Sequence, residues 1–295
     1  MSDPMARALR SMPMVFVLIW STGFIVARYG MPHAPPMGFL AWRYTLSALA
    51  FLLWVKLAGA AWPQGRAQYG HLAVTGVLMH AGYLGGVWAA VKLGLGAGTA
   101  ALIVGLQPLL TAVWISATGS SHHVSARQWL GLLLGFGGLS LVVAHKLGQG
   151  ELTAVNLALA VLALLSITVG TLYQKSHVKP CDVRSANLVQ LLAAWCVTLP
   201  LALLEHEPVV WHPEMIGALA WSVLALTLGG SSLLYMLIQR GATTQVTSLM
   251  YLVPPCTAVM AWALFHEQLG GLTLLGIALA VSGVALVARP RPLAG

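Results

Sequence analysis

Histidine, tyrosine and tryptophan side chains lie inside several long apolar segments of this chain. His80 and Tyr83 are three residues apart, so they share one face of a helix, and Trp88 continues roughly along it. Aromatic rings offer broad apolar faces, while hydroxyl and imidazole groups can bind amino and carboxylate ends. Such side chains would line a cavity that suits amino acids. The other residues expected to line it are Trp20, Thr22, Thr168, Tyr173, Tyr235 and Tyr251.

Each of these residues also has a purely structural interpretation. Tryptophan and tyrosine anchor helices at membrane interfaces, which explains Trp42, Trp62 and Trp88 at least as well as substrate contact does. His80 is either a hydrogen-bonded structural histidine or a group that contacts substrate or responds to pH. Both interpretations stay open at the level of the sequence.

Arg43 is the most costly residue inside an apolar segment. An arginine at the centre of a membrane helix costs about 2.5–3.5 kcal/mol. We expect Arg43 to donate hydrogen bonds to backbone carbonyls at a break in a helix; the alternative is that it binds a substrate carboxylate. Gln107 lies directly before Pro108, and Gln190 is the counterpart of Arg43 in the internal repeat described below. Both are candidates to supply polar contacts for exposed backbone, and Gln107 is a further candidate for the binding site.

The acidic residues all lie in tails, in loops or at helix ends. A proton-coupled drug antiporter commonly keeps a carboxylate within the membrane, where it binds either a proton or a cation. The sequence therefore favours facilitated movement of a neutral or zwitterionic solute, and proton-coupled efflux of drugs and metabolites is the alternative. The seven acids are Asp3, Glu151, Asp182, Glu205, Glu207, Glu214 and Glu267.

Motifs that would indicate an enzyme or a metal centre are incomplete. Residues 266–270 lack the second histidine of a zinc-binding helix, and residues 229–233 lack the final glycine of a nucleophile elbow. The adjacent pair His122-His123 is more typical of a solvated turn, and the three cysteines form no C-x-x-C. We expect no enzyme activity, no cofactor, no metal and no ATP-binding loop. A membrane enzyme or a non-transporting assembly subunit is the alternative from another class.

The composition is that of a protein that lies mostly within a membrane. Of 295 residues, 58% are hydrophobic and 7% are charged, whereas soluble domains carry about 25% charged residues. The mean hydropathy is +0.83. A membrane helix needs about 20 mainly apolar residues, so we predict an all-α protein with ten transmembrane helices. They cover 13–29, 38–58, 71–91, 98–116, 126–144, 152–174, 184–203, 214–237, 244–265 and 270–288.

The charges indicate membrane topology rather than nucleic-acid binding, although the net charge is +8. With the N-terminus inside, eleven basic residues fall at the cytoplasmic ends of the ten segments and four fall on the other side. Basic residues collect on the cytoplasmic side, so we predict that both termini are cytoplasmic. The first segment is predicted to be a transmembrane helix rather than a cleaved signal, because no small-residue cleavage site follows it.

The chain contains an internal repeat. Residues 97–145 have a second copy at 242–290 with an offset of 145, and upstream the offset is 147. Each copy belongs to a half of five apolar segments, which we predict to span 13–145 and 152–290. An odd number of crossings turns the second half upside down. Many transporters build a site near the bilayer midplane from inverted halves.

Matched prolines and glycines predict where the helices bend. Pro108 and Pro254 occupy corresponding positions in the fourth and ninth segments, and Gly82 corresponds to Gly229. A proline removes a backbone hydrogen bond and kinks a helix, and matched interruptions in two inverted halves indicate a transport site or gate. We therefore predict that these four residues are kink or gate positions. A static kink that only shapes packing is the alternative.

Small residues four apart in the fifth and tenth segments predict close helix packing. Such spacing lets two membrane helices approach closely, either within one chain or between the copies of a dimer. We assign these helices a scaffold role. The residues are Gly131, Gly135 and Gly138 in the first half and Gly276, Ala280 and Gly283 in the second.

Several motifs occur in order along the chain and resemble a known family. They are the run from Trp20 to Arg28, Ala-Trp-Arg-Tyr at 41–44, Pro-Pro-Cys-Thr-Ala at 254–258 and the turn and helix at 265–284. Over nearly its whole length the chain is similar to the EamA branch of the drug/metabolite transporter superfamily, and within it to the YddG-type aromatic amino-acid exporters. One departure is His122-His123, where the second repeat has His266-Glu267.

The resemblance implies a ten-helix transporter of small metabolites in the inner membrane of a bacterium. Its cavity would be lined chiefly by helices one, three and four and by their partners six, eight and nine. We therefore predict an exporter of amino acids, aromatic or apolar ones above all, that works by alternating access and is facilitated rather than ATP-driven. Its partners would be the small-molecule substrate and the lipid bilayer, with no nucleic acid, and a monomer is compatible with the sequence.

Overall fold

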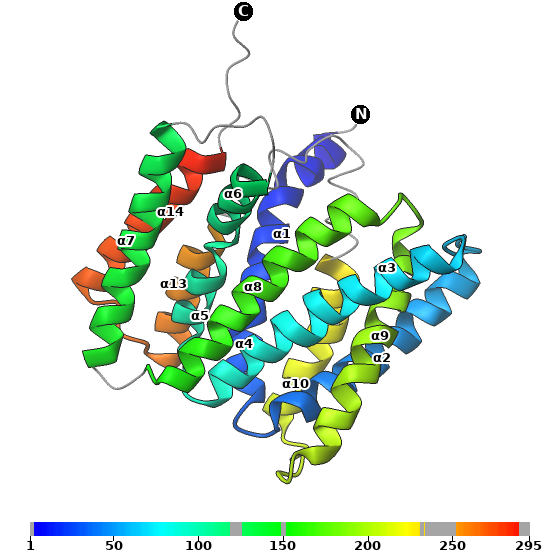
Figure 1. Ribbon diagram of the computed structural model, residues 1–295. Coiled ribbons are helices and arrows are strands. Elements are labelled where there is room, and N and C mark those ends of the chain that lie inside the picture. Colours follow the sequence, from blue (N-terminus) through cyan, green and yellow to red (C-terminus); the bar gives the residue numbers. More distant parts are fainter. Residues whose placement is uncertain (1–2, 119–125, 149–151, 231–232, 234–251, 289–295) are drawn as a thin grey trace, which may run out of the picture.

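The computed structural model describes residues 3–118, 126–148, 152–230, 233 and 252–288, and this part of the chain is helical and contains no strand (Figure 1). The all-α class is thereby confirmed. A helix satisfies every backbone polar group within itself, which long apolar segments require. The elements are α1 (Asp3–Gly30), α2 (Pro36–Leu57), α3 (Arg66–Gly76), η1 (Val77–Gly82), α4 (Tyr83–Lys92), α5 (Ala97–Val104), α6 (Gln107–Thr118), α7 (Ala126–Gly148), α8 (Ala154–His177), α9 (Val183–Leu204), α10 (Pro213–Trp221), η2 (Ser222–Gly230), α13 (Val253–Phe265) and α14 (Gly271–Ala288).

Within the described residues, five helical stretches are long and apolar enough to cross a membrane, and five shorter apolar helices accompany them. The predicted count of ten crossings and the cytoplasmic termini therefore stay predictions. Two predicted segments, 214–237 and 244–265, extend beyond the described ranges. The long stretches are Pro36–Leu57, Arg66–Lys92, Ala154–His177, Val183–Leu204 and Pro213–Gly230; the shorter helices are Met14–Gly30, Ala97–Thr111, Trp129–His145, Val253–Phe265 and Gly271–Leu286.

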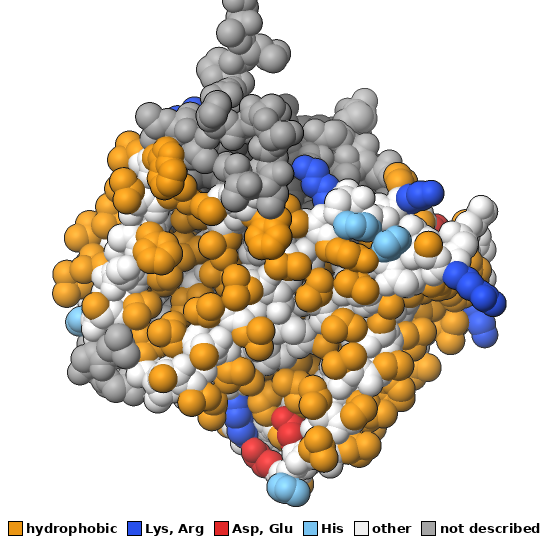
Figure 2. All heavy atoms as spheres, in the orientation of Figure 1, with side chains coloured by type: hydrophobic (Ala, Val, Ile, Leu, Met, Phe, Trp, Pro, Cys, Tyr) orange, Lys and Arg blue, Asp and Glu red, His pale blue; other side chains and the backbone are white. Residues whose placement is uncertain are grey.

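The outer surface of the bundle is apolar. Leu49, Leu53 and Leu57 follow one face of α2 at four-residue spacing, and all three are exposed, Leu57 by 78%. Hydrophobic side chains cover most of the described surface in Figure 2, while Lys, Glu and His gather towards its ends. Exposed apolar patches of this extent mark a surface that contacts something other than water, and here that surface surrounds the helices.

The two halves of the chain are intertwined rather than placed side by side. Helix α2 of the first half packs on α9, α4 packs on α8, and α5 packs on α13. The beginning of α1 and the end of α14 lie at the same end of the bundle (Figure 1). Contacts between the halves therefore make up much of the interior, and a site at their junction draws residues from both.

Helices α7 and α14 form one closely packed pair within this chain (Figure 1). A Cβ atom at Gly138 would lie 2.4 Å from the carbonyl oxygen of Gly276, and one at Gly283 would lie 2.4 Å from that of Gly131. Residue numbers rise along one helix as they fall along the other, so the helices are antiparallel. The predicted small-residue contact lies within the fold, where backbones meet too closely for any side chain.

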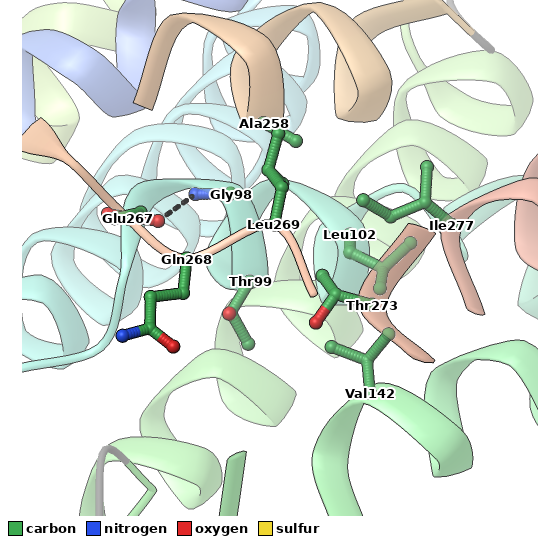
Figure 3. Close-up of a pocket in the computed structure, with 10 residues that line it drawn as sticks. All are labelled: Gly98, Thr99, Leu102, Val142, Ala258, Glu267, Gln268, Leu269, Thr273 and Ile277. Carbon is green, nitrogen blue, oxygen red and sulfur yellow. Dashed lines mark hydrogen bonds between the residues drawn. The ribbon is translucent and has the colours of Figure 1, made fainter. Parts of the chain in front are cut away.

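Carboxylates of the second half cap helices of the first. Glu267, just after α13, accepts hydrogen bonds from the N–H groups of Ala97 and Gly98 at 2.8 and 3.3 Å (Figure 3). Glu205 binds the start of α2 in the same way, at 2.8 and 3.0 Å. Negative charge at a helix N-terminus is favourable. The small cavity beside Glu267 measures about 10 Å³, room for about one water molecule. Through their contacts, Glu267 and Glu205 act as helix caps.

We predict that Gly138→Ala destabilises the protein while Gly137→Ala does not. The added methyl at Gly138 meets the backbone of α14, and overpacking of this kind costs about 1–3 kcal/mol. Gly137 has no atom within 4 Å of its added Cβ, so its replacement gains helix propensity, up to about 1 kcal/mol. Thermal unfolding of the two purified variants checks this; equal melting temperatures would contradict the scaffold role of the α7–α14 contact.

Candidate substrate-binding site

Two neighbouring cavities, each of about 110 Å³, lie between the two halves. Both are bordered by Trp20 and Phe24 of α1, Tyr83 of α4 and Ile167 of α8. The remaining lining residues come from α1, α2, α4, η1 and η2 around the first cavity and from α5, α6, the turn between them and α13 around the second. These are the helices that the family resemblance implied, together with α2, which contributes only Arg43.

The predicted residues divide between the two cavities. Trp20, Arg43, His80 and Tyr83 line the first, and Trp88 lies with them. Trp20 and Tyr83 also border the second cavity, whose other predicted residues are Gln107, Pro108 and Pro254. Seven of the expected side chains are thus brought to one region of the fold.

Two π-helical turns occupy matching places in the two halves. Segment η1 covers Val77–Gly82 and η2 covers Ser222–Gly230. The repeat offset of 147 places the counterpart of η1 within η2. The same offset of 147 makes His80 and Thr227 counterparts, and both line the first cavity. Single π-helical turns often mark functional sites because they interrupt the regular backbone pairing. Here each turn supplies one polar side chain to the cavity wall.

Two polar pairs cross between the halves at these turns. Arg43 donates from Nη2 to the Thr227 hydroxyl at 3.2 Å, and that hydroxyl donates to the Ser222 carbonyl of η2 at 2.8 Å. The side chain of Gln190, the counterpart of Arg43, lies next to that of His80, the counterpart of Thr227. Arg43 of α2 in the first half thus contacts η2 of the second half, and Gln190 of α9 in the second half contacts η1 of the first. We call these the crossed pairs.

Arg43 and Trp88 carry the donors that define the first cavity. The guanidinium carbon of Arg43 lies 5.4 Å from the centroid of the Trp88 ring, a cation–π distance. Arg43 is 7% exposed and Trp88 is 2% exposed. Arg43 Nη1 and Trp88 Nε1 have no hydrogen-bond partner among the described atoms. Both groups are hydrogen-bond donors only, so each is left to pair with a hydrogen-bond acceptor.

Both prolines stand beside the second cavity, each in the first turn of a helix. The fourth apolar segment is interrupted at Gly105 and resumes as α6, of which Pro108 is the second residue. Pro254 is the second residue of α13 in the described structure, whereas the sequence had placed it in mid-helix. A Cβ at Gly105 would lie 2.7 Å from the Pro254 ring, so the two interruptions touch each other.

Gln107 connects this region to the second half. Its amide nitrogen donates to the Thr171 hydroxyl at 3.0 Å, and that hydroxyl donates to the Ile167 carbonyl of α8 at 2.7 Å. The sequence had suggested a contact with exposed backbone. The contact instead runs through a hydroxyl on a neighbouring helix, just as that of Arg43 does.

Three predicted residues do not line these two cavities because their hydroxyls are engaged elsewhere. Thr22 of α1 is half-buried and accepts a hydrogen bond from the exposed Trp221 of α10 at 2.8 Å. Thr168 is buried and donates to a carbonyl of its own helix at 2.6 Å. Tyr173 bonds His71 at 2.9 Å, near the end of α8. Each contact is structural, and a substrate role for these three stays a prediction without support in the cavity lining.

The remaining predictions fall on helix bends and on undescribed residues. Tyr235 and Tyr251 lie outside the described residues. Gly82 permits close packing, since a Cβ there would lie 2.7 Å from the Ser166 hydroxyl. Gly229 lies within η2. Thr227 was missed by the sequence analysis, although the offset of 147 would have identified it as the counterpart of His80.

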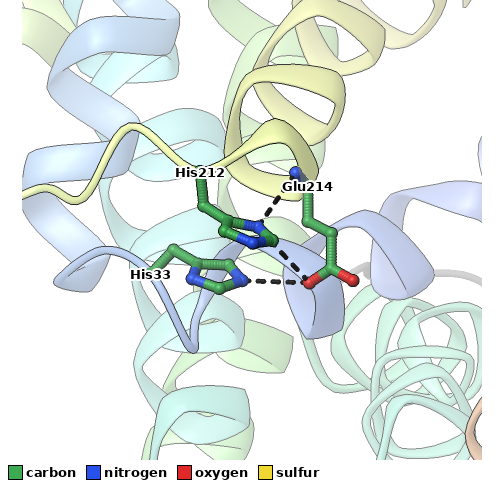
Figure 4. Close-up of side chains that lie close together, drawn as sticks. All are labelled: His33, His212 and Glu214. Carbon is green, nitrogen blue, oxygen red and sulfur yellow. Dashed lines mark hydrogen bonds and ion pairs between the residues drawn. The ribbon is translucent and has the colours of Figure 1, made fainter.

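One group among the described residues offers metal-ligand atoms within 4.8 Å of one another, namely His33, His212 and Glu214 (Figure 4). His33 Nε2 lies 2.9 Å from the Glu214 carboxylate, and the two imidazole rings stack at 4.2 Å. His212 Nδ1 accepts the Glu214 backbone N–H at 3.3 Å, which caps α10. None of the three residues lines either cavity. Their contacts join the α1–α2 turn to the start of α10.

Comparison with known proteins identifies the family. The model of the EamA-like transporter family matches residues 11–144 and again 155–289. The chain belongs to this family. The double match also agrees with the internal repeat found in the sequence, and together with the apolar helices it establishes a transmembrane transporter rather than an enzyme.

Curated relatives of this EamA transporter carry transport names. It is 22% identical over 293 residues to a "Probable amino-acid metabolite efflux pump" of Escherichia coli (strain K12), covering 95% of this chain and 94% of the relative. It is 24% identical over 273 residues to the "Uncharacterized inner membrane transporter YedA" of the same organism, covering 92% and 87%. A solved protein structure matches with a TM-score of 0.63 at 16% identity over 95% of this chain and 97% of that chain, which shows a shared fold.

We predict that Thr227→Val destabilises this transporter whereas Thr198→Val does not. The first change deprives buried Arg43 of its acceptor, and an unsatisfied buried donor costs about 1–3 kcal/mol. The Thr198 hydroxyl is fully buried and has no partner among the described atoms, so its replacement is neutral or stabilising. Thermal unfolding compares the two isosteric changes. A similar loss in both variants would mean that the bond from Arg43 contributes nothing.

Proposed function

We propose that this EamA transporter exports amino acids with aromatic or apolar side chains, and related metabolites, by alternating access. The observation that carries the proposal is the cavity between the halves, whose lining contains aromatic rings and the hydrogen-bond donors of Arg43 and Trp88. Trp20, Tyr83 and Trp88 offer faces for an apolar side chain, and Arg43 and His80 lie beside them. A relative named as a probable amino-acid metabolite efflux pump supports the same substrate class.

The architecture we propose is that of two inverted repeats, 13–145 and 152–290, with ten crossings and both termini in the cytoplasm. The shared end of α1 and α14, the antiparallel α7–α14 pair and the crossed pairs support inverted halves. The distribution of basic residues supports the orientation. An inner-membrane relative supports placement in the inner membrane of a bacterium. The unit we propose is a monomer, because the cavity is lined by one chain.

The moving parts in this proposal are the interrupted helices. Pro108 and Pro254 both line the second cavity, where a break in the helix lowers the cost of bending. Gly82 and Gly229 lie in the π-turns that carry the crossed pairs. The α7–α14 pair, which packs backbone on backbone, stays fixed while the cavity walls move around it. Bending at matched positions of two inverted halves would expose the cavity to each side in turn.

A facilitated mechanism follows from the placement of the acids. Among the described residues, each carboxylate whose contacts are known is bound to a helix N-terminus, a base or a histidine. None lines either cavity. A proton-coupled drug pump commonly keeps a carboxylate that exchanges a proton for a cation, whereas the ionisable residues of the first cavity are Arg43, His80 and Tyr83. The gradient of the solute itself would then drive export.

The first test is counterflow of labelled amino acids in liposomes. We expect flux of L-phenylalanine and smaller flux of L-serine, because the aromatic walls favour an apolar side chain. Trp20→Ala should reduce phenylalanine flux by about tenfold, since aromatic contacts contribute about 0.5–1.5 kcal/mol beyond their buried area. Trp129→Ala is the control, because Trp129 is exposed on α7. Absence of counterflow for every amino acid would refute the proposal.

The second test separates facilitated from coupled transport. We expect collapse of the proton gradient with an uncoupler to leave phenylalanine flux unchanged, because no cavity carboxylate binds a proton in exchange for substrate. Flux measured in the same liposomes with and without the uncoupler checks this. A strict requirement for the gradient, or drug resistance conferred on a sensitive host, would favour the proton-coupled multidrug pump.

A further inference from the structure

The first cavity contains a buried positive charge with spare hydrogen-bonding capacity. Arg43 uses Nη2 for Thr227 at 3.2 Å, while Nη1 has no partner among the described atoms. Trp88 Nε1, on the ring beneath the guanidinium, is also without a partner. Unsatisfied buried donors are costly, and both belong to residues that line the first cavity. A group that completes this site must accept hydrogen bonds, and a negative charge on it would be favoured.

No carboxylate of the protein can fill that role in the described structure. Glu205 and Glu267 cap helices, and Glu207, Glu214 and Asp182 pair with Lys92, His33 and Arg184. Asp3, at the start of α1, lies 17 residues before Trp20, about 25 Å along the helix. Glu151 lies outside the described residues, and the undescribed stretch 234–251 contains no acidic residue. Among the described residues, no carboxylate is therefore positioned to accept a hydrogen bond from Arg43 Nη1 or Trp88 Nε1, and a ligand carboxylate can take this place.

The positions of the acidic residues also determine the surroundings of a substrate ammonium group in the first cavity. An ammonium in the first cavity would face the like charge of Arg43 and no carboxylate, and its attraction to aromatic faces is about 0.5–2 kcal/mol. A substrate ammonium therefore gains little there and loses its hydration. A carboxylate gains an arginine in the same place. The two ends of an amino acid are thus treated unequally.

We propose that Arg43, with Trp88, binds the substrate carboxylate, and that the ammonium group is dispensable, so that the transporter also carries aromatic carboxylates without an amino group. This inference rests on the proposed function and deepens it, since it names the recognised group. It also specifies what is rejected: aromatic amines without a carboxylate. Carboxylate binding at Nη1 leaves the bond to Thr227 in place, so the crossed pair orients Arg43 for the ligand.

The experiment compares four ligands that share one aromatic ring. L-Phenylalanine carries both charged ends, 3-phenylpropanoate carries only the carboxylate, and phenethylamine and phenylalaninamide carry only the amine. Each unlabelled compound competes with labelled phenylalanine in counterflow at pH 7.5, at equal concentration on both sides, so passive leakage changes nothing. We expect 3-phenylpropanoate to compete within about threefold of phenylalanine, and both amines to be weaker by tenfold or more.

A matched pair of variants tests the residues. Trp88→Phe keeps an aromatic ring and removes the spare donor, so inhibition by 3-phenylpropanoate should weaken about threefold to tenfold. Trp195→Phe also removes an indole N–H, but this one bonds Thr45 at 2.9 Å away from both cavities, so inhibition should be unchanged. Arg43→Gln should abolish the preference for carboxylates over amines in any fraction that folds, and the wild-type series decides the matter if it does not fold.

The outcomes separate this inference from the proposed function. Phenylalanine flux that 3-phenylpropanoate inhibits and the amines do not supports the inference. Phenylalanine flux with inhibition only by compounds that carry an amine overturns it and leaves the proposed function intact. If no amino acid is transported, the proposed function fails, and ligand-induced shifts in melting temperature then decide the inference: stabilisation by the amines but not by 3-phenylpropanoate, or by none of the four, overturns it.

Discussion

The cost of an unpaired polar group in an apolar interior is the constraint on which this structure depends. The chain meets it within each helix and also by bonds between its two halves. Arg43 reaches Thr227, Gln190 reaches His80, and Glu267 caps α5. Polar residues that are spread thinly along the sequence therefore meet at the junction of the halves, which is also where the cavities lie.

The two repeats have equivalent π-turns and equivalent positions for the crossed pairs, but they carry different side chains there. The crossed pairs occupy equivalent positions on α2 and η2 and on α9 and η1, yet one pair contains an arginine and the other a glutamine. Backbone features that shape the fold are shared, among them the π-turns and the glycines of α7 and α14. The charge is not shared. In the proposed transport cycle, an inverted framework would rock symmetrically while its binding site keeps one positive side.

Among the described residues, the lining of the first cavity contains a cation, Arg43, and no carboxylate, which is why a negatively charged group is proposed for the ligand. This arrangement links the two proposals physically, because the absence of a cavity carboxylate argues against proton exchange and equally favours an acidic substrate. The aromatic walls then select the rest of the molecule by its apolar area. Membership of the EamA-like transporter family is consistent with such use of a common framework, since fold alone does not specify a substrate.

The sequence by itself determined the helical class, the repeat, the small-residue spacing that predicts close helix packing and the absence of acids from the apolar segments, because composition, periodicity and self-similarity are local or directly countable. It also placed His80 beside Tyr83. That the two glycine-bearing helices pack on each other was decided by the tertiary structure. Only the tertiary structure decided that Arg43 meets Thr227 across 184 residues, and that Thr22 and Tyr173 bond away from the cavities. Helical spacing states which side chains share a face, whereas the neighbour that each face meets is set by how the helices pack.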